Sequence, residues 1–108
     1  MSKLSITIDQ GITDGLAPTH PGEVLKDELA ALGLSASAFA VALDVPANRI
    51  SGIIAGKRAV TADTALRLGR FFGTSAKFWL NLQDLYDLKR AAAAAGPRIV
   101  ERVHPRAA

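Results

Sequence analysis

The side chains with the clearest chemical capacity lie close together in the middle of the chain. Asn48 carries an amide that can pair with an adenine edge, and Arg49 carries a guanidinium fork that fits a guanine edge. Ser51 adds a hydroxyl shortly after them. Lys57 and Arg58 follow as two adjacent cations of the kind that bind phosphate. Residues of these types in this order are suited to contacts with a DNA duplex.

The surrounding sequence predicts how these side chains are held. Residues 36–43 and 47–55 are expected to form two short helices joined by a tight turn at residues 44–46. The second helix has one buried face, because its large apolar residues recur at helical spacing as Ile50, Ile53 and Ile54. Its opposite face carries Asn48, Arg49 and Ser51. This is the helix-turn-helix arrangement, in which the first helix braces the second and the second lies in a major groove.

Three further helices are predicted around this pair, which gives an all-α fold of five helices. Each is bounded by residues that typically start or stop a helix, with Pro, Thr or Ser at the beginning and Gly at the end. With their caps, the predicted spans are 20–33, 61–73 and 75–95. Gly96-Pro97 is expected to close the last helix, and residues 98–103 are then expected to form a short strand or an extended arm.

The predicted organisation is one helix-turn-helix domain, residues 20–96, between two short segments. A chain of 108 residues with a hydrophobic content of 49% is long enough for one core. Residues 1–19 begin with alternating apolar and polar residues and continue with Gly and Pro, which indicates a short strand or an N-terminal arm. Residues 97–108 are interpreted as a C-terminal tail.

Charge is distributed unevenly along the chain. Residues 1–45 contain two basic and six acidic side chains, whereas residues 46–80 contain six basic side chains and one acidic. The positive excess begins where the second helix of the pair begins, and a phosphate backbone is its natural partner. A solvated surface that happens to be basic would give the same pattern, so charge alone leaves both interpretations open.

Catalytic and metal-binding patterns have little support. The chain has no cysteine and only two histidines, His20 and His104, neither of which has a nucleophile nearby in the sequence. No HExxH or GxSxG pattern occurs, and residues 52–58 lack the spacing of a phosphate loop. We therefore predict a protein that is not an enzyme and has no metal, cofactor or small-molecule substrate. The lack of cysteine and of long apolar runs favours the cytoplasm and no membrane partner.

Four stretches in this order resemble a known family. They are HPGEVL at 20–25, VPANRIS at 45–51, IAGKRAVT at 54–61, and FWLNLQ at 78–83 with YDL at 86–88. Together they are similar to the HigA antitoxins, which belong to the Xre/Cro-like helix-turn-helix proteins and are also described as plasmid-maintenance antidote proteins. The resemblance implies a five-helix Xre-type (lambda-repressor-like) DNA-binding domain that forms a homodimer. It further implies that the protein neutralises a HigB-type ribonuclease toxin and represses its own operon by binding operator DNA.

The resemblance also assigns roles to individual residues by position. Base-facing places of the recognition helix fall on Ala47, Asn48, Arg49 and Gly52, beside the exposed Ser51. Phosphate-contacting places fall on Ser35, Ser37, Lys57 and Arg58. Two departures stand out: Gly52 lies where a long polar side chain is common in the family, and Pro46 lies where a capping Ser or Thr is common.

The last predicted helix is too apolar to contact a single core alone. Its large apolar residues form two stripes, so one stripe can pack on the core and the other on a second copy of the chain. We therefore predict a homodimer through this helix, with Trp79, Leu82 and Tyr86 at its interface.

Two other functions remain compatible with the same fold. One is a stand-alone Xre-family repressor without a toxin partner. The other is a protein-interaction module whose DNA binding is vestigial, which Gly52 and the modest net charge of +3 favour.

Overall fold

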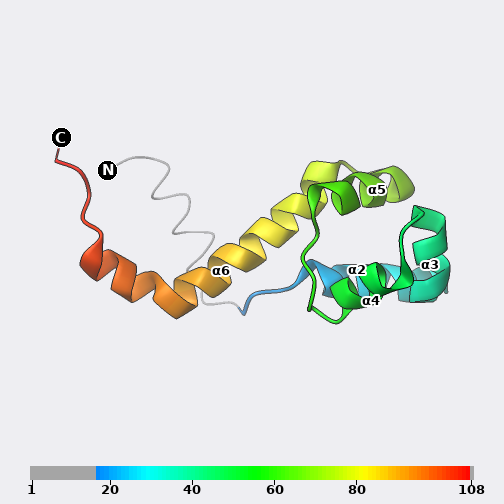
Figure 1. The fold of residues 1–108 in the computed structure, drawn as a ribbon, viewed down its shortest axis with the longest axis horizontal. Helices are drawn as coiled ribbons and strands as arrows, with labels where there is room; N and C mark the ends of the chain where they lie inside the picture. Colours follow the sequence, from blue (N-terminus) through cyan, green and yellow to red (C-terminus); the bar gives the residue numbers. More distant parts are fainter. Residues whose placement is uncertain (1–16, 108) are drawn as a thin grey trace. The chain divides into compact units, whose positions relative to one another are not determined.

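Five α-helices succeed one another in the computed structural model, which describes residues 17–107 (Figure 1). Their bounds are α2 (Pro21–Leu32), α3 (Ala36–Leu43), α4 (Ala47–Ile54), α5 (Ala62–Phe72) and α6 (Ala76–Arg102). Residues 17–107 contain no strand, and the predicted all-α fold is confirmed. The chain divides into two compact units inside α6: residues 19–84 form one unit, and the other includes residues 85–107.

The unit of residues 19–84 contains the hydrophobic core, to which every helix contributes. The core side chains include Leu25 and Leu29 of α2, Phe39 and Leu43 of α3, Ile50 and Ile53 of α4, Leu68 of α5 and Trp79 of α6. Aromatic rings connect α3, α5 and α6, because Phe72 lies 5.7 Å from Phe39 and 5.6 Å from Trp79 between ring centroids. This core fixes α4 on its buried side and leaves the other side free.

The start of α2 is fixed by a cap and by a close approach to α4. His20 caps the helix, because its Nδ1 accepts a hydrogen bond of 2.9 Å from the backbone N–H of Gly22. Pro21 occupies the beginning of the helix, where its missing donor causes no loss. At Gly22 the two backbones nearly touch, since an added Cβ would lie 1.9 Å from the carbonyl oxygen of Ile53. A glycine at this place lets α2 pack directly on the end of α4.

The end of α6 differs from the sequence prediction. The helix continues through Gly96 and Pro97 to Arg102, so the predicted closure at Gly96-Pro97 and the strand or arm over residues 98–103 are both wrong. Proline removes one backbone donor and usually breaks a helix. Here the five alanines of residues 91–95 precede it, and alanine is the strongest helix former. The helical hydrogen bonds of the backbone also resume after the proline, because the N–H of Val103 donates to the carbonyl of Ile99 at 2.7 Å.

The predicted N-terminal arm over residues 1–19 lies mostly outside the described residues. Residues 17–19 are described, and they form neither a helix nor a strand. Among the helices of residues 17–107, none combines the length and the apolar character that crossing a membrane would require.

Candidate nucleic-acid interface

The helix-turn-helix consists of α3, a tight turn and α4. Ser35 caps α3, because its Oγ accepts a hydrogen bond of 3.1 Å from the N–H of Ala38. Asp44 adopts a left-handed conformation with φ 56° in the turn, which aspartate tolerates better than most residues. Pro46 begins α4 without a side-chain cap, as its place in the sequence indicated. The turn thus reverses the chain through one left-handed residue and one proline.

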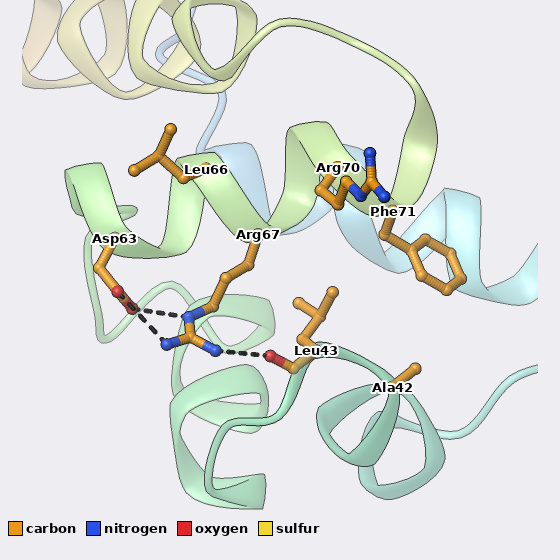
Figure 2. A pocket seen from close by; sticks show the side chains of 7 residues that line it. All are labelled: Ala42, Leu43, Asp63, Leu66, Arg67, Arg70 and Phe71. Atoms are coloured by element: carbon orange, nitrogen blue, oxygen red, sulfur yellow. Dashed lines mark hydrogen bonds and ion pairs between the residues drawn. The ribbon is translucent and has the colours of Figure 1, made fainter.

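A side chain from α5 holds this turn from outside. Arg67 Nη1 donates to the carbonyl oxygens of Leu43 at 2.9 Å and of Asp44 at 3.1 Å. These two carbonyls lie at the end of α3, where backbone acceptors have no partner within the helix. Figure 2 shows the Arg67 guanidinium between the carbonyl of Leu43 and the carboxylate of Asp63. Arg67 therefore links α5 to the turn between α3 and α4.

The free face of α4 carries three of the predicted base-facing residues. Ile50 and Ile53 are completely buried, which fixes the rotation of the helix about its axis. Ala47, Asn48 and Ser51 are exposed on the opposite side. The structure therefore presents these three side chains outward, as the periodicity predicted.

Gly52, which was predicted to face bases, is not an open position on that face. A Cβ added at Gly52 would lie 2.8 Å from Cδ and 2.9 Å from Cγ of Arg58. The stem of Arg58 therefore covers Gly52. The chain folds back after α4, so residues six apart in sequence come into contact.

Arg49 is engaged by an acidic residue of α5. Its Nη1 lies 2.6 Å from Oδ2 of Asp63, and the same oxygen lies 3.0 Å from Nε of Arg67. The side chain of Arg49 is 32% exposed and that of Asp63 is 57% exposed. Exposed ion pairs are weak, so a base edge or a phosphate can replace Asp63 as the partner of Arg49. In the unbound protein, however, Arg49 is held beside α5 and not free.

The two arginines lower the pKa of the Asp63 carboxyl. The hydrogen bond from Arg67, and then that from Arg49, hold the pKa of the Asp63 carboxyl below its usual value of 3.8. A lower pKa in the folded state means that the unfolded state binds the proton more readily, so acidification favours unfolding. The stabilising contribution is present at neutral pH and is lost as the pH falls below 3.8 through the folded-state pKa.

Asp63→Asn is therefore expected to lower the free energy of unfolding at neutral pH, and the difference from wild type should shrink below pH 3.8. Urea unfolding followed by circular dichroism, from neutral pH to below pH 3.8, measures the free energy of unfolding of wild type and of Asp63→Asn. Asp27→Asn, at an exposed aspartate of α2, is the matched control. A destabilisation by Asp63→Asn that stays constant between neutral and acidic pH would contradict the proposed linkage.

The loop after α4 is fixed at both ends. At its start, the N–H groups of Lys57 and Arg58 donate to the carbonyl of Gly52 at 2.9 and 3.1 Å. At its end, the N–H of Val60 donates to Oε1 of Gln83 on α6 at 2.8 Å, and both groups are buried. Lys57 and Arg58 therefore stay at the end of the recognition helix. The role of Gln83 was missed, although its stretch FWLNLQ was among those that carried the family resemblance.

The predicted phosphate contacts at the start of α3 remain accessible. Ser35 and Ser37 are both exposed. The Ser35 hydroxyl oxygen already accepts a hydrogen bond from the helix backbone, and its proton can still be donated to a phosphate oxygen.

The residues predicted at the dimer interface have different environments. Trp79 is 2% exposed in the core and its Nε1–H donates to Oγ1 of Thr74 at 3.1 Å, so its assignment to an interface is wrong. Leu82 is half-buried and packs against the core. Tyr86 is half-buried and its hydroxyl accepts a 3.2 Å hydrogen bond from Arg90. The periodicity of the sequence indicates that Trp79 is buried. It does not indicate whether the core of the same chain or a second copy of the chain buries it.

A pocket of about 510 Å³ is formed by residues of α3 and α5 (Figure 2). Its lining combines apolar and charged side chains, namely Ala42, Leu43, Asp63, Leu66, Arg67, Arg70 and Phe71. None of the predicted DNA-contacting residues lines it. The pocket nevertheless adjoins α4, because Asp63 in its lining forms the ion pair with Arg49.

Comparison with known proteins identifies the family of this chain. The helix-turn-helix family matches residues 25–79. A solved addiction module antidote protein of the HigA family from Coxiella burnetii is 50% identical, with a TM-score of 0.83, over 84% of this chain and 100% of that chain. The chain belongs to the HigA antitoxin family. Its members are helix-turn-helix regulators and not enzymes.

Two further relatives extend the comparison. Pseudomonas aeruginosa antitoxin HigA, solved with the higBA promoter, is 46% identical with a TM-score of 0.80 and covers 83% of this chain and 99% of that chain. Virulence-associated protein I of Dichelobacter nodosus is 56% identical over 73 residues, which are 67% of this chain and 68% of that protein.

Proposed function

We propose that this HigA-family protein binds the operator of its own operon as a dimer, represses transcription, and neutralises a HigB-type ribonuclease toxin. The observation that carries the DNA-binding part is the free polar face of α4, with Asn48 exposed and two cations fixed at the helix end. A helix held in this way fits a major groove, and the cations can contact the adjacent backbone. The Pseudomonas relative, solved with promoter DNA, supports the same use of the fold. This function requires the cytoplasm, where operator DNA lies.

Among the predicted contacts, Asn48 and Ser51 suit base edges, and Ala47 can contact a thymine methyl group. Arg49 joins them when it leaves Asp63 for a guanine edge. Ser35, Ser37 and Lys57 suit phosphates on either side of the groove. This arrangement accounts for the polar face of α4 without a metal or cofactor.

The dimer is proposed to form through the part of α6 that follows Asp84. Apolar residues recur there at alternating spacings of three and four, as in helices that pair lengthwise. They are Leu85, Leu88, Ala92, Ala95 and Ile99. Leu85 and Leu88 are exposed in the single chain, at 42% and 47%. Tyr86 lies beside this stripe, so it remains part of the proposed interface, whereas Leu82 contributes at most its exposed edge.

Electrophoretic mobility shift with DNA from upstream of the gene tests operator binding. We expect a shift for wild type and an affinity about tenfold lower for Asn48→Ala, because one good bidentate base contact contributes about 1–3 kcal/mol. Asn81→Ala, at an exposed asparagine of α6, should bind like wild type. No shift at low salt would instead favour the interaction module with vestigial DNA binding.

The toxin partner is tested separately, by co-expression with the neighbouring gene and purification through a tag on this protein. We expect the neighbouring product to co-purify and to lose its RNA-cleaving activity in the complex. A neighbouring product that neither binds nor loses activity would favour the stand-alone repressor.

A further inference from the structure

The side chain of Arg58 occupies the place on the recognition helix that Gly52 leaves empty. Gly52 lies one turn after Asn48, so a side chain at position 52 would stand beside Asn48 on the free face. The Cγ and Cδ atoms of Arg58 fill that space, at 2.9 and 2.8 Å from where a Cβ of residue 52 would be. An arginine from outside the helix therefore lies on the face expected to enter the groove.

This placement is held by the backbone on both sides of Arg58. The N–H of Arg58 donates to the carbonyl of Gly52 itself, at 3.1 Å. Gly56 makes the required reversal with φ 74°, a conformation that favours glycine. The N–H of Val60 is bound by the buried Gln83. The stem of Arg58 is therefore directed across α4 by a loop that is fixed at both ends.

The charges near α4 distinguish Arg58 from Arg49. Arg49 has Asp63 as its counter-ion at 2.6 Å. The guanidinium of Arg58, in contrast, makes no hydrogen bond or ion pair with any of the residues 17–107. Both arginines line one pocket of about 320 Å³ beside the helix, together with Ala59, Thr61 and Thr64. Of the two guanidinium groups, that of Arg58 is the one free to take a new partner.

We infer that Arg58 is a specificity-determining residue that reads a guanine edge in place of a side chain at position 52. This inference rests on the proposed operator binding. It replaces the assignment of Arg58 to a phosphate. Arginine pairs with the O6 and N7 atoms of guanine through two hydrogen bonds, which requires a guanidinium on the groove-facing side of the helix. Gly52 is then needed because it leaves room for the stem of Arg58.

The test begins with duplexes that wild-type protein selects from a randomised DNA library, and with every single-base-pair substitution of the preferred duplex. Arg58→Ala is expected to bind the preferred duplex about tenfold or more weakly, and to lose its discrimination at one base pair per half-site. Lys57→Ala is the matched control. It should weaken binding to all duplexes alike and reduce the salt slope by about 0.9.

Two variants at position 52 test the placement itself. Gly52→Ala should displace Arg58 and relax the same base pair, while thermal stability is kept or raised because alanine favours helices. In the double variant Arg58→Ala with Gly52→Gln, the two closest atoms, Cγ and Cδ of Arg58, are removed. The Cβ at 58 then lies 3.5 Å from the Cβ at 52, which is an ordinary contact. Glutamine pairs with adenine, so the preference at that base pair should change from guanine to adenine.

The outcomes separate the inference from the proposed function. If wild-type protein selects no duplex, operator binding and this inference are both wrong. If wild type binds specifically but Arg58→Ala weakens all duplexes equally, Arg58 contacts phosphate and only this inference is overturned. Unchanged discrimination in both Gly52 variants would also overturn it.

Discussion

Gly22→Ala is expected to lower the free energy of unfolding by about 3 kcal/mol or more, because it overpacks a rigid backbone contact. The added Cβ would lie 1.9 Å from the carbonyl oxygen and 2.8 Å from the carbonyl carbon of Ile53. Neither atom belongs to a flexible side chain, so α2 and α4 would have to separate. Because α4 is the recognition helix, the same change should weaken DNA binding. Urea unfolding followed by circular dichroism measures the stability.

Gly96→Ala is the matched control for this substitution. Gly96 also lies inside a helix, but a Cβ there would meet only the Cβ of Ala92 at 3.9 Å. Alanine should therefore stabilise the protein by about 0.5–1 kcal/mol through helix propensity alone. Equal stability changes for Gly22→Ala and Gly96→Ala would show that the contact between Gly22 and Ile53 does not determine the packing.

Trp79→Ala is expected to lower the free energy of unfolding by about 3–5 kcal/mol, as large-to-small core substitutions do. Trp79 is almost fully buried, packs on Phe72 and donates to Thr74. Since Trp79 is the only tryptophan, unfolding is followed by circular dichroism and not by fluorescence. Trp79→Phe retains most of the ring packing and keeps the fold available for measurement, with a smaller loss of stability.

The oligomeric state distinguishes a core residue from an interface residue. Trp79→Phe should leave the monomer–dimer equilibrium unchanged in sedimentation experiments. Leu88→Lys, at an exposed position of α6, should dissociate the dimer with little effect on monomer stability. It should also weaken operator binding by about a hundredfold or more, because a monomer loses the second, linked half-site contact that a dimer makes. Dissociation by Trp79→Phe together with a dimeric Leu88→Lys would return Trp79 to the interface.

Local signals determined the helices of this protein. Helix caps such as Ser35 and Thr61, the stop at Gly33 and the periodic isoleucines of α4 act within one or two turns of the chain, so their effects can be predicted from neighbours in sequence. Gly96-Pro97 is the exception, because the helix propensity of the preceding alanines prevailed over a stop signal. The exposure of Asn48 and Ser51 followed from the same periodicity.

Only the tertiary structure decided which partner each side chain takes. Arg49 was expected to be free, but it meets Asp63, fourteen residues later. Gly52 was expected to face DNA with open space around it, but the stem of Arg58 lies over it. Trp79 was expected at an interface but packs in the core. Composition and periodicity show that a side chain is apolar or charged and on which side of its helix it lies. They do not show what lies opposite, because that depends on how separate helices meet in space.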